Sequence, residues 1–137
     1  MSSLEDLANR VVKAYKSFDI DTIKKGNVCS YDPKEDVITL NFSIITRYLD
    51  HFRILHELSH RIQRQETLLY GNTSEIELNA NRIAYRAYEK LRFPLTYEVT
   101  RHINYNNLHN LNPRLTQREI MRKIAGKKEL IWRLPTC

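Results

Sequence analysis

Two long helical patterns occupy about residues 43–66 and 74–92 of this sequence, and the segment Gly71-Asn72-Thr73-Ser74 interrupts them. Ser74 precedes Glu77 by three residues, the spacing of a capping box, which indicates where the second helix begins. That helix must end before Pro94, because the residue preceding a proline is pushed out of the helical region. The sequence therefore predicts two consecutive long helices in the middle of the chain.

Shorter elements flank these helices. Ser3 is a candidate N-cap for an amphipathic helix, and β-branched and aromatic runs around a Pro33-containing turn are typical of two antiparallel strands. Residues 95–111 show no clear pattern, and Gly126 closes a short basic helix. The shorter elements are predicted as a helix at 3–17, strands at 28–31 and 37–42, and a helix at 116–125. Together they predict one α+β domain over residues 1–137, with a few-stranded antiparallel or mixed sheet packed on helices.

The first long helix carries His56-Glu57-Leu58-Ser59-His60, an H-E-x-x-H motif. Histidines at positions i and i+4 lie about 40° apart around a helix, so both imidazoles project toward one ion. Zinc takes nitrogen ligands, and a site with three protein ligands keeps a position for water. Glu57 lies about 100° from His56 around the helix, beside such an ion, where it can act as the general base toward a metal-bound water.

Apolar residues adjoin the two histidines on this helix, so the pair is expected to border the core. The apolar arc consists of Ile44, Tyr48, Leu55, Leu58 and Ile62. The alternative interpretation is two surface histidines that pair with neighbouring carboxylates.

A zinc site of this kind needs a third protein ligand. Glu66 stands six residues beyond His60, but Gln63 replaces the helix-breaking glycine that such a spacing requires. On an unbroken helix Glu66 points about 120° away from His60, so we reject it. His102 and His109 are further candidates, in segments whose structure the sequence leaves undefined.

Glu77, on the next helix, is the better candidate. The small residues Ala80 and Ala87 lie beside its face, and they let two helices approach closely enough to share a ligand set. Asn81, one turn beyond Glu77, can hydrogen-bond a ligand histidine. The competing interpretations are a plain surface carboxylate for Glu77 and a solvated polar residue for Asn81.

These motifs resemble a known family. H-E-L-x-H, followed by Glu77-Leu78-Asn79-Ala80-Asn81-Arg82-Ile83-Ala84, is similar to the ImmA/IrrE group of gluzincin metallopeptidases over about residues 28–94. The resemblance implies a zincin-like domain with one zinc ion on His56, His60 and Glu77 and with Glu57 as the base. It also implies a protein substrate, often a DNA-binding helix-turn-helix repressor cut at one site. Ser59 stands where the family usually has glycine, and Ile83 where it usually has phenylalanine.

The expected activity is zinc-dependent hydrolysis of a peptide bond by an endopeptidase. An extended peptide is expected to add to the edge of the strand at 37–42, and a further donor is expected to stabilise the oxyanion. The candidate donors are Tyr85, Tyr88, His102, Tyr105 and His109. A catalytically inactive metal-binding interaction protein is an alternative.

Positive charge is concentrated at the C-terminal end. Residues 101–137 hold eight basic and two acidic side chains, a difference that equals the net charge of +6 of the whole chain. Such a segment favours an acidic partner, and a basic nucleic-acid-binding module is the second alternative. The basic extension, about residues 112–137, is expected to be dispensable for the metal site. Its candidate contact residues are Arg114, Arg118, Arg122, Lys123, Lys127, Lys128 and Arg133.

Cysteine content and hydropathy indicate the cellular compartment of the protein. Cys29 and Cys137 are too few for a disulfide framework and lack metal-type spacing. No run of residues is long and apolar enough for a membrane span, and acidic Glu5 and Asp6 stand where a secretory signal needs lysine. We therefore expect a reduced, cytoplasmic protein without membrane contact.

Overall fold

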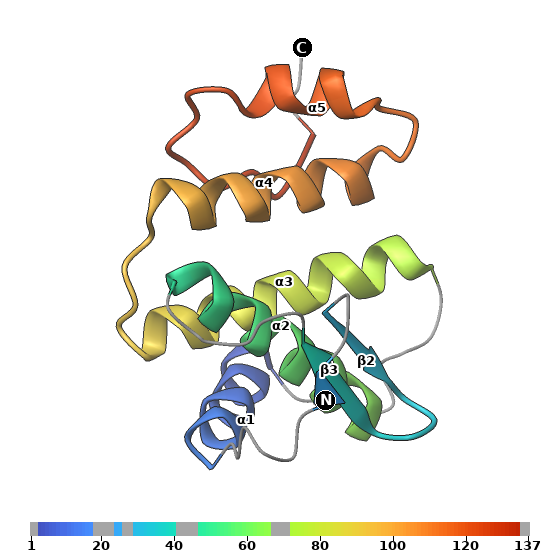
Figure 1. The fold of residues 1–137 in the computed structure, drawn as a ribbon, viewed down its shortest axis with the longest axis vertical. Coiled ribbons are helices and arrows are strands. Elements are labelled where there is room, and N and C mark those ends of the chain that lie inside the picture. Colours follow the sequence, from blue (N-terminus) through green and yellow to red (C-terminus); the bar gives the residue numbers. More distant parts are fainter. Residues whose placement is uncertain (1–2, 18–23, 26–28, 41–46, 67–71, 135–137) are drawn as a thin grey trace.

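The computed structural model describes residues 3–17, 24–25, 29–40, 47–66 and 72–134 of the chain. Five helices and a small sheet make this part of the chain α+β (Figure 1). The helices are α1 (Leu4–Lys16), α2 (Tyr48–Gln65), α3 (Thr73–Lys90), α4 (Tyr97–Leu111) and α5 (Gln117–Ile124). The strands are β1 (Lys24–Lys25), β2 (Ser30–Asp32) and β3 (Val37–Leu40).

Side-chain caps fix where the helices begin. Ser3 and Asp6 form a capping box on α1, as Thr116 and Glu119 do on α5. The cap of α3 is Asn72, whose side chain accepts from the backbone N–H of Ser74 at 2.7 Å. The predicted cap at Ser74 is therefore wrong by two residues, although the predicted helix is confirmed.

The helix α4 occupies the segment that the sequence left undefined. Thr96 caps it, accepting from the backbone N–H of Val99 at 3.2 Å. Its buried face includes the polar residues Thr100, Asn104 and Asn107. Because the two faces of α4 differ little in polarity, no helical pattern stands out in its sequence.

The sheet has the order β1-β3-β2. β2 runs antiparallel to β3 with Tyr31 opposite Ile38, and β1 runs parallel to β3 with Lys25 opposite Leu40. The two predicted antiparallel strands are confirmed at Ser30–Asp32 and Val37–Leu40, while positions 28 and 41–42 lie outside the described residues. Strand β1 was not predicted, and its pairing makes β3 the central strand.

The core forms where α1, α2 and α3 pack together, with the sheet against α2. Ala80, Ala84 and Ala87 of α3 are fully buried, so the predicted close approach of α2 and α3 is present. Figure 1 shows α3, α4 and α5 stacked in that order, with α1 and the strands at the other end of the molecule. None of the helices in the described ranges is long and apolar enough to cross a membrane.

Candidate metal centre

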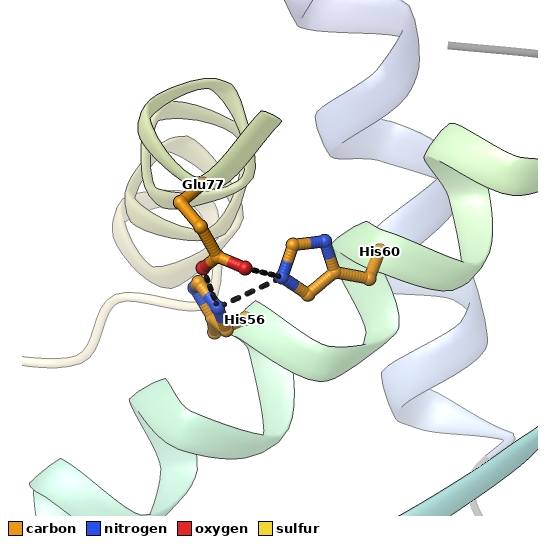
Figure 2. A group of neighbouring side chains, drawn as sticks. All are labelled: His56, His60 and Glu77. Atoms are coloured by element: carbon orange, nitrogen blue, oxygen red, sulfur yellow. Dashed lines mark hydrogen bonds and ion pairs between the residues drawn. The ribbon is translucent and has the colours of Figure 1, made fainter. Parts of the chain in front are cut away.

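His56, His60 and Glu77 meet between α2 and α3 (Figure 2). The Nε2 atoms of the two histidines lie 3.0 Å apart. Each also lies 3.1 Å from one oxygen of the Glu77 carboxylate. One turn of α2 sets the spacing of the histidines, and the close contact of α2 with α3 brings the carboxylate to them. Among the described residues, no other group of three or more His, Cys, Asp or Glu side chains meets in this way.

An amide oxygen faces the outer nitrogen of each histidine. The Nδ1 atom of His56 lies 2.7 Å from Oδ1 of Asn81, and Nδ1 of His60 lies 2.8 Å from Oε1 of Gln63. Because an amide oxygen only accepts, these contacts favour a proton on Nδ1 and leave the lone pair on Nε2. Both lone pairs then point toward the Glu77 carboxylate.

This donor set fits a divalent cation. Two imidazole nitrogens and two carboxylate oxygens converge, and all are acceptors once the histidines are protonated on Nδ1. Acceptors placed this closely need a cation among them. Two histidines and one carboxylate are a set typical of catalytic zinc, which keeps a fourth position for water or substrate. His56, His60 and Glu77 would therefore hold the ion.

The electrostatics of the three residues are mutually supporting. Burial alone raises the pKa of Glu77, but the two histidine rings beside the carboxylate outweigh that effect and hold its pKa well below its usual range. Burial alone lowers the pKa of His60, but the bond to Glu77 and the charges of Glu77 and Glu57 outweigh it and raise that pKa. The carboxylate is thus held ionised beside the two rings.

Glu57 lies beside this group without joining it. Its side chain is only 7% exposed, and its Oε1 lies 4.0 Å from Nε2 of His56. Burial raises the pKa of the Glu57 carboxyl, an effect that the neighbouring histidines partly offset. A buried carboxyl with a raised pKa, next to a metal ligand set, is suited to accept and return a proton.

A cavity of about 460 Å³ opens at the three side chains. Strand β2 contributes Ser30 and Tyr31 to its wall, and α4 contributes His102 and Asn106. Burial, together with the nearby Arg53 cation and His56, lowers the pKa of His102 to about 4, so its imidazole is neutral at neutral pH. Its other described contacts are with Asn106 and with the ring of Phe52.

Of the candidate oxyanion donors, only His102 lines this cavity. The Tyr88 hydroxyl instead donates to the carbonyl of Pro94 at 2.5 Å inside the core, and Tyr85 packs on Trp132. Tyr105 and His109 are also absent from the cavity wall. Tyr85 and Tyr88 of α3 therefore have packing roles. Their spacing in the sequence could not distinguish such a role from a place in the site.

Arg53 is a charged cavity-lining residue that the sequence analysis did not single out. Its Nη1 lies 3.8 Å from Oδ1 of the buried Asp50, and its side chain is 33% exposed. It makes no hydrogen bond with any residue in the described ranges. A signal was available, because Arg53 stands one turn before His56 on the same helix, but arginines on amphipathic helices are usually solvated.

Other predicted residues fall outside the cavity. Glu66, rejected as a ligand, forms an ion pair with Arg10. Leu55, Leu58 and Ile62 are buried as predicted, whereas Tyr48 is exposed, which contradicts its place in the apolar arc, and position 44 is not described. The seven candidate contact cations of the C-terminal extension are all exposed: Arg114, Arg118, Arg122, Lys123, Lys127, Lys128 and Arg133.

Comparison with known proteins adds no relative. No protein-family model, no curated protein and no solved structure matches this chain. The geometry of the site defines a candidate metal centre of two histidines and one glutamate, with a buried second glutamate beside it and an open cavity in front.

Proposed function

We propose that this chain is a zinc-dependent endopeptidase of the zincin-like, gluzincin type. The observation that carries the proposal is Glu57, a buried carboxyl 4.0 Å from a ligand nitrogen of the His56, His60 and Glu77 group. A purely structural metal site has no use for an ionisable group at this place. The resemblance of the two motifs to ImmA/IrrE metallopeptidases supports the same function.

Each residue has a role in hydrolysis. Zinc, when bound, supplies Lewis acidity that activates water and polarises a carbonyl. Glu57 accepts a proton from the attacking water and returns it to the leaving amine, as its raised pKa allows. His102, neutral and facing the cavity, is positioned to donate a hydrogen bond to the developing oxyanion.

The sheet indicates where a substrate would lie. β3 pairs on both sides, with β1 and β2, so the expected addition of a peptide to the edge of β3 is wrong. Within the described sheet β2 is an edge strand, and its Ser30 and Tyr31 also line the cavity. An extended segment of a protein substrate can add to β2 and cross the metal centre. A cytoplasmic DNA-binding repressor is the substrate that the family resemblance suggests.

A second candidate function is contact with nucleic acid, either beside or in place of catalysis. Arg10, Arg47, Arg61, Arg86 and Lys90 all have acidic partners. None of the seven exposed cations beyond residue 112 has an ion pair within the described part of the chain. Unpaired cations on one segment favour a polyanion. Duplex DNA binding that weakens steeply with salt would support this function, and its absence at low salt would exclude it.

The test of the peptidase uses Glu57→Gln. The amide keeps the shape of the side chain but cannot accept the proton, so zinc content should stay at one per chain while cleavage falls about 10²–10⁴-fold or more. Wild-type and variant proteins are incubated with candidate protein substrates, and products are followed by mass spectrometry with a chelator control. Equal cleavage by the two proteins would overturn the role of Glu57. Cleavage by neither protein, with zinc bound, would favour an inactive metal-binding protein.

A further inference from the structure

The segment after α5 is bound along α4 by a buried amide. Residues 129–132, here called the C-terminal strap, form no helix or strand. Asn104 of α4 donates from Nδ2 to the carbonyl of Glu129 at 2.9 Å and accepts from the N–H of Ile131 at 2.7 Å. Leu130 and Trp132 pack against the same core cluster as α2 and α3. Part of the extension that was expected to be dispensable for the metal site therefore packs on the core.

Hydrogen bonds lead from the strap to a ligand histidine. Asn107 donates from Nδ2 to the carbonyl of Ile131 at 2.8 Å, and its Oδ1 accepts from Nδ2 of Asn81 at 3.0 Å. Oδ1 of Asn81 lies 2.7 Å from Nδ1 of His56. Both asparagines are buried, so water does not compete for their amide groups.

These bonds have a direction. The carbonyl of Ile131 can only accept, so Asn107 must present its NH₂ group there and its oxygen to Asn81. Asn81 must then present its NH₂ group to Asn107 and its oxygen to His56. With an oxygen facing Nδ1, His56 keeps a proton on Nδ1, so Nε2, which faces Glu77, is the nitrogen left to bind a metal ion.

The other ligand histidine has a shorter version of the same arrangement. Oε1 of Gln63 faces Nδ1 of His60, and Nε2 of Gln63 donates to the carbonyl of Ile76 at 3.0 Å. In both cases a backbone carbonyl fixes the orientation of a side-chain amide, and the amide oxygen then fixes the proton on Nδ1 of a histidine. The difference is that the carbonyl for His60 belongs to α3, whereas the carbonyl for His56 belongs to the strap.

We propose that the C-terminal strap, acting through Asn107 and Asn81, holds His56 in the tautomer that presents Nε2 to a metal ion. Asn107 is then a positioning residue of the metal centre, and release of the strap lowers metal affinity. This inference rests on the proposed metal-binding function, although it concerns a hydrogen-bond chain that exists without the metal.

The experiment uses four variants of the full chain. Asn107→Leu breaks the chain of bonds, and Asn104→Leu loosens the strap without touching Asn81. Asn104→Leu/Asn107→Asp is the rescue variant, because a carboxyl group at position 107 accepts from Asn81 even when the strap is loose. Asn110→Leu is the matched control, since among the described residues the Asn110 amide bonds only the carbonyl of Asn106 on the same helix. Zinc affinity is measured by competition with a chelator, and the His56 tautomer of the metal-free protein by ¹⁵N NMR.

The expected result is a zinc affinity about 10–100-fold weaker in Asn104→Leu and in Asn107→Leu than in the control Asn110→Leu. Their His56 spectrum should show that Nδ1 is no longer fully protonated, and the rescue variant should recover both properties. The inference is overturned if Asn104→Leu and Asn107→Leu bind zinc as tightly as the control. It is also overturned if the rescue variant binds zinc as weakly as Asn104→Leu, because the loss of affinity would then come from packing. If Asn107→Leu fails to fold, the comparison of Asn104→Leu with Asn104→Leu/Asn107→Asp tests the inference. A wild-type protein that binds no zinc would overturn the proposed function, while the tautomer would still test the strap.

Discussion

Gln63 and His60 stand one turn apart on α2, with Oε1 of the glutamine 2.8 Å from Nδ1 of the histidine. Gln63 is 1% exposed and also donates to the carbonyl of Ile76 in α3. It therefore joins the two helices that hold the metal ligands while it fixes the tautomer of one of them. In the sequence, Gln63 marked only the absence of a helix-breaking glycine.

The first prediction concerns this glutamine. Gln63→Leu removes the acceptor for Nδ1 of His60, so zinc affinity should fall about 10–100-fold. Gln63→Glu keeps an acceptor at the same distance and should bind zinc at least ten times more tightly than Gln63→Leu. Competition with a chromogenic chelator measures both affinities. Equal affinities in the two variants would show that the Gln63 amide does not support the ligand.

The second prediction concerns the ligand set. His56→Ala, His60→Ala and Glu77→Ala should each lose stoichiometric zinc, because two remaining donors bind the ion poorly. His109→Ala, at an exposed position of α4, is the control and should retain one zinc per chain. Elemental analysis of the purified proteins gives the metal content. A Glu77→Ala protein with full affinity would show that the third ligand has been assigned wrongly.

The third prediction concerns acid stability. Glu5 of α1 bonds Arg86 of α3 and lies 2.6 Å from Nζ of Lys90, and these contacts lower its pKa to about 2. A carboxyl with a lowered folded-state pKa stabilises the fold above its unfolded pKa of about 4.5. That stabilisation is lost as the pH falls toward 2.

Urea denaturation of wild type and Glu5→Gln tests this effect. Wild type should have the larger free energy of unfolding at pH 7, and the difference should shrink as the pH falls below about 4.5. Glu35→Gln is the control, because the Glu35 side chain has no ion pair within the described residues, and it should show no such difference. A Glu5→Gln difference that stays constant with pH would mean that Glu5 acts by packing.

The sequence predicts the helices around the metal centre well because each of them buries a row of apolar residues at helical spacing, beside its buried polar residues. α2 and α3 each bury a stripe of aliphatic or small residues, which gives a clear helical period. α4 was not predicted, because Thr100, Asn104 and Asn107 lie on its buried face and blur that period. β1 was missed for a different reason, since two lysines have no strand signature and their pairing depends on β3.

The candidate site likewise has one part that the sequence predicts and one part that it does not. The spacing of His56 and His60, and the position of Glu77 on the next helix, follow from helical geometry, which the sequence displays directly. The contacts of Asn107 and Asn104 with the strap join residues 24 to 27 positions apart, and the strap itself forms no helix or strand. No local pattern encodes such contacts, so only the tertiary structure shows them.

The last prediction concerns Arg53 and the ligands that the cavity accepts. Its guanidinium lines the cavity with the metal ligands and makes no hydrogen bond with the residues that the structure describes, while Asp50 lies 3.8 Å away. A guanidinium binds a carboxylate with two parallel hydrogen bonds, so a ligand with a carboxylate near its metal-binding group should be favoured.

Cobalt-loaded protein is titrated with mercaptocarboxylic acids and with mercaptoalcohols of equal chain length, and the visible absorption gives each affinity. Loss of one charge-assisted pair costs about 1.5–3 kcal/mol, so Arg53→Met should reduce the preference for the acid about tenfold or more. Arg53→Lys, which keeps the charge but not the fork, should fall between the two. The same preference in wild type and Arg53→Met would show that Arg53 only balances the charge of Asp50.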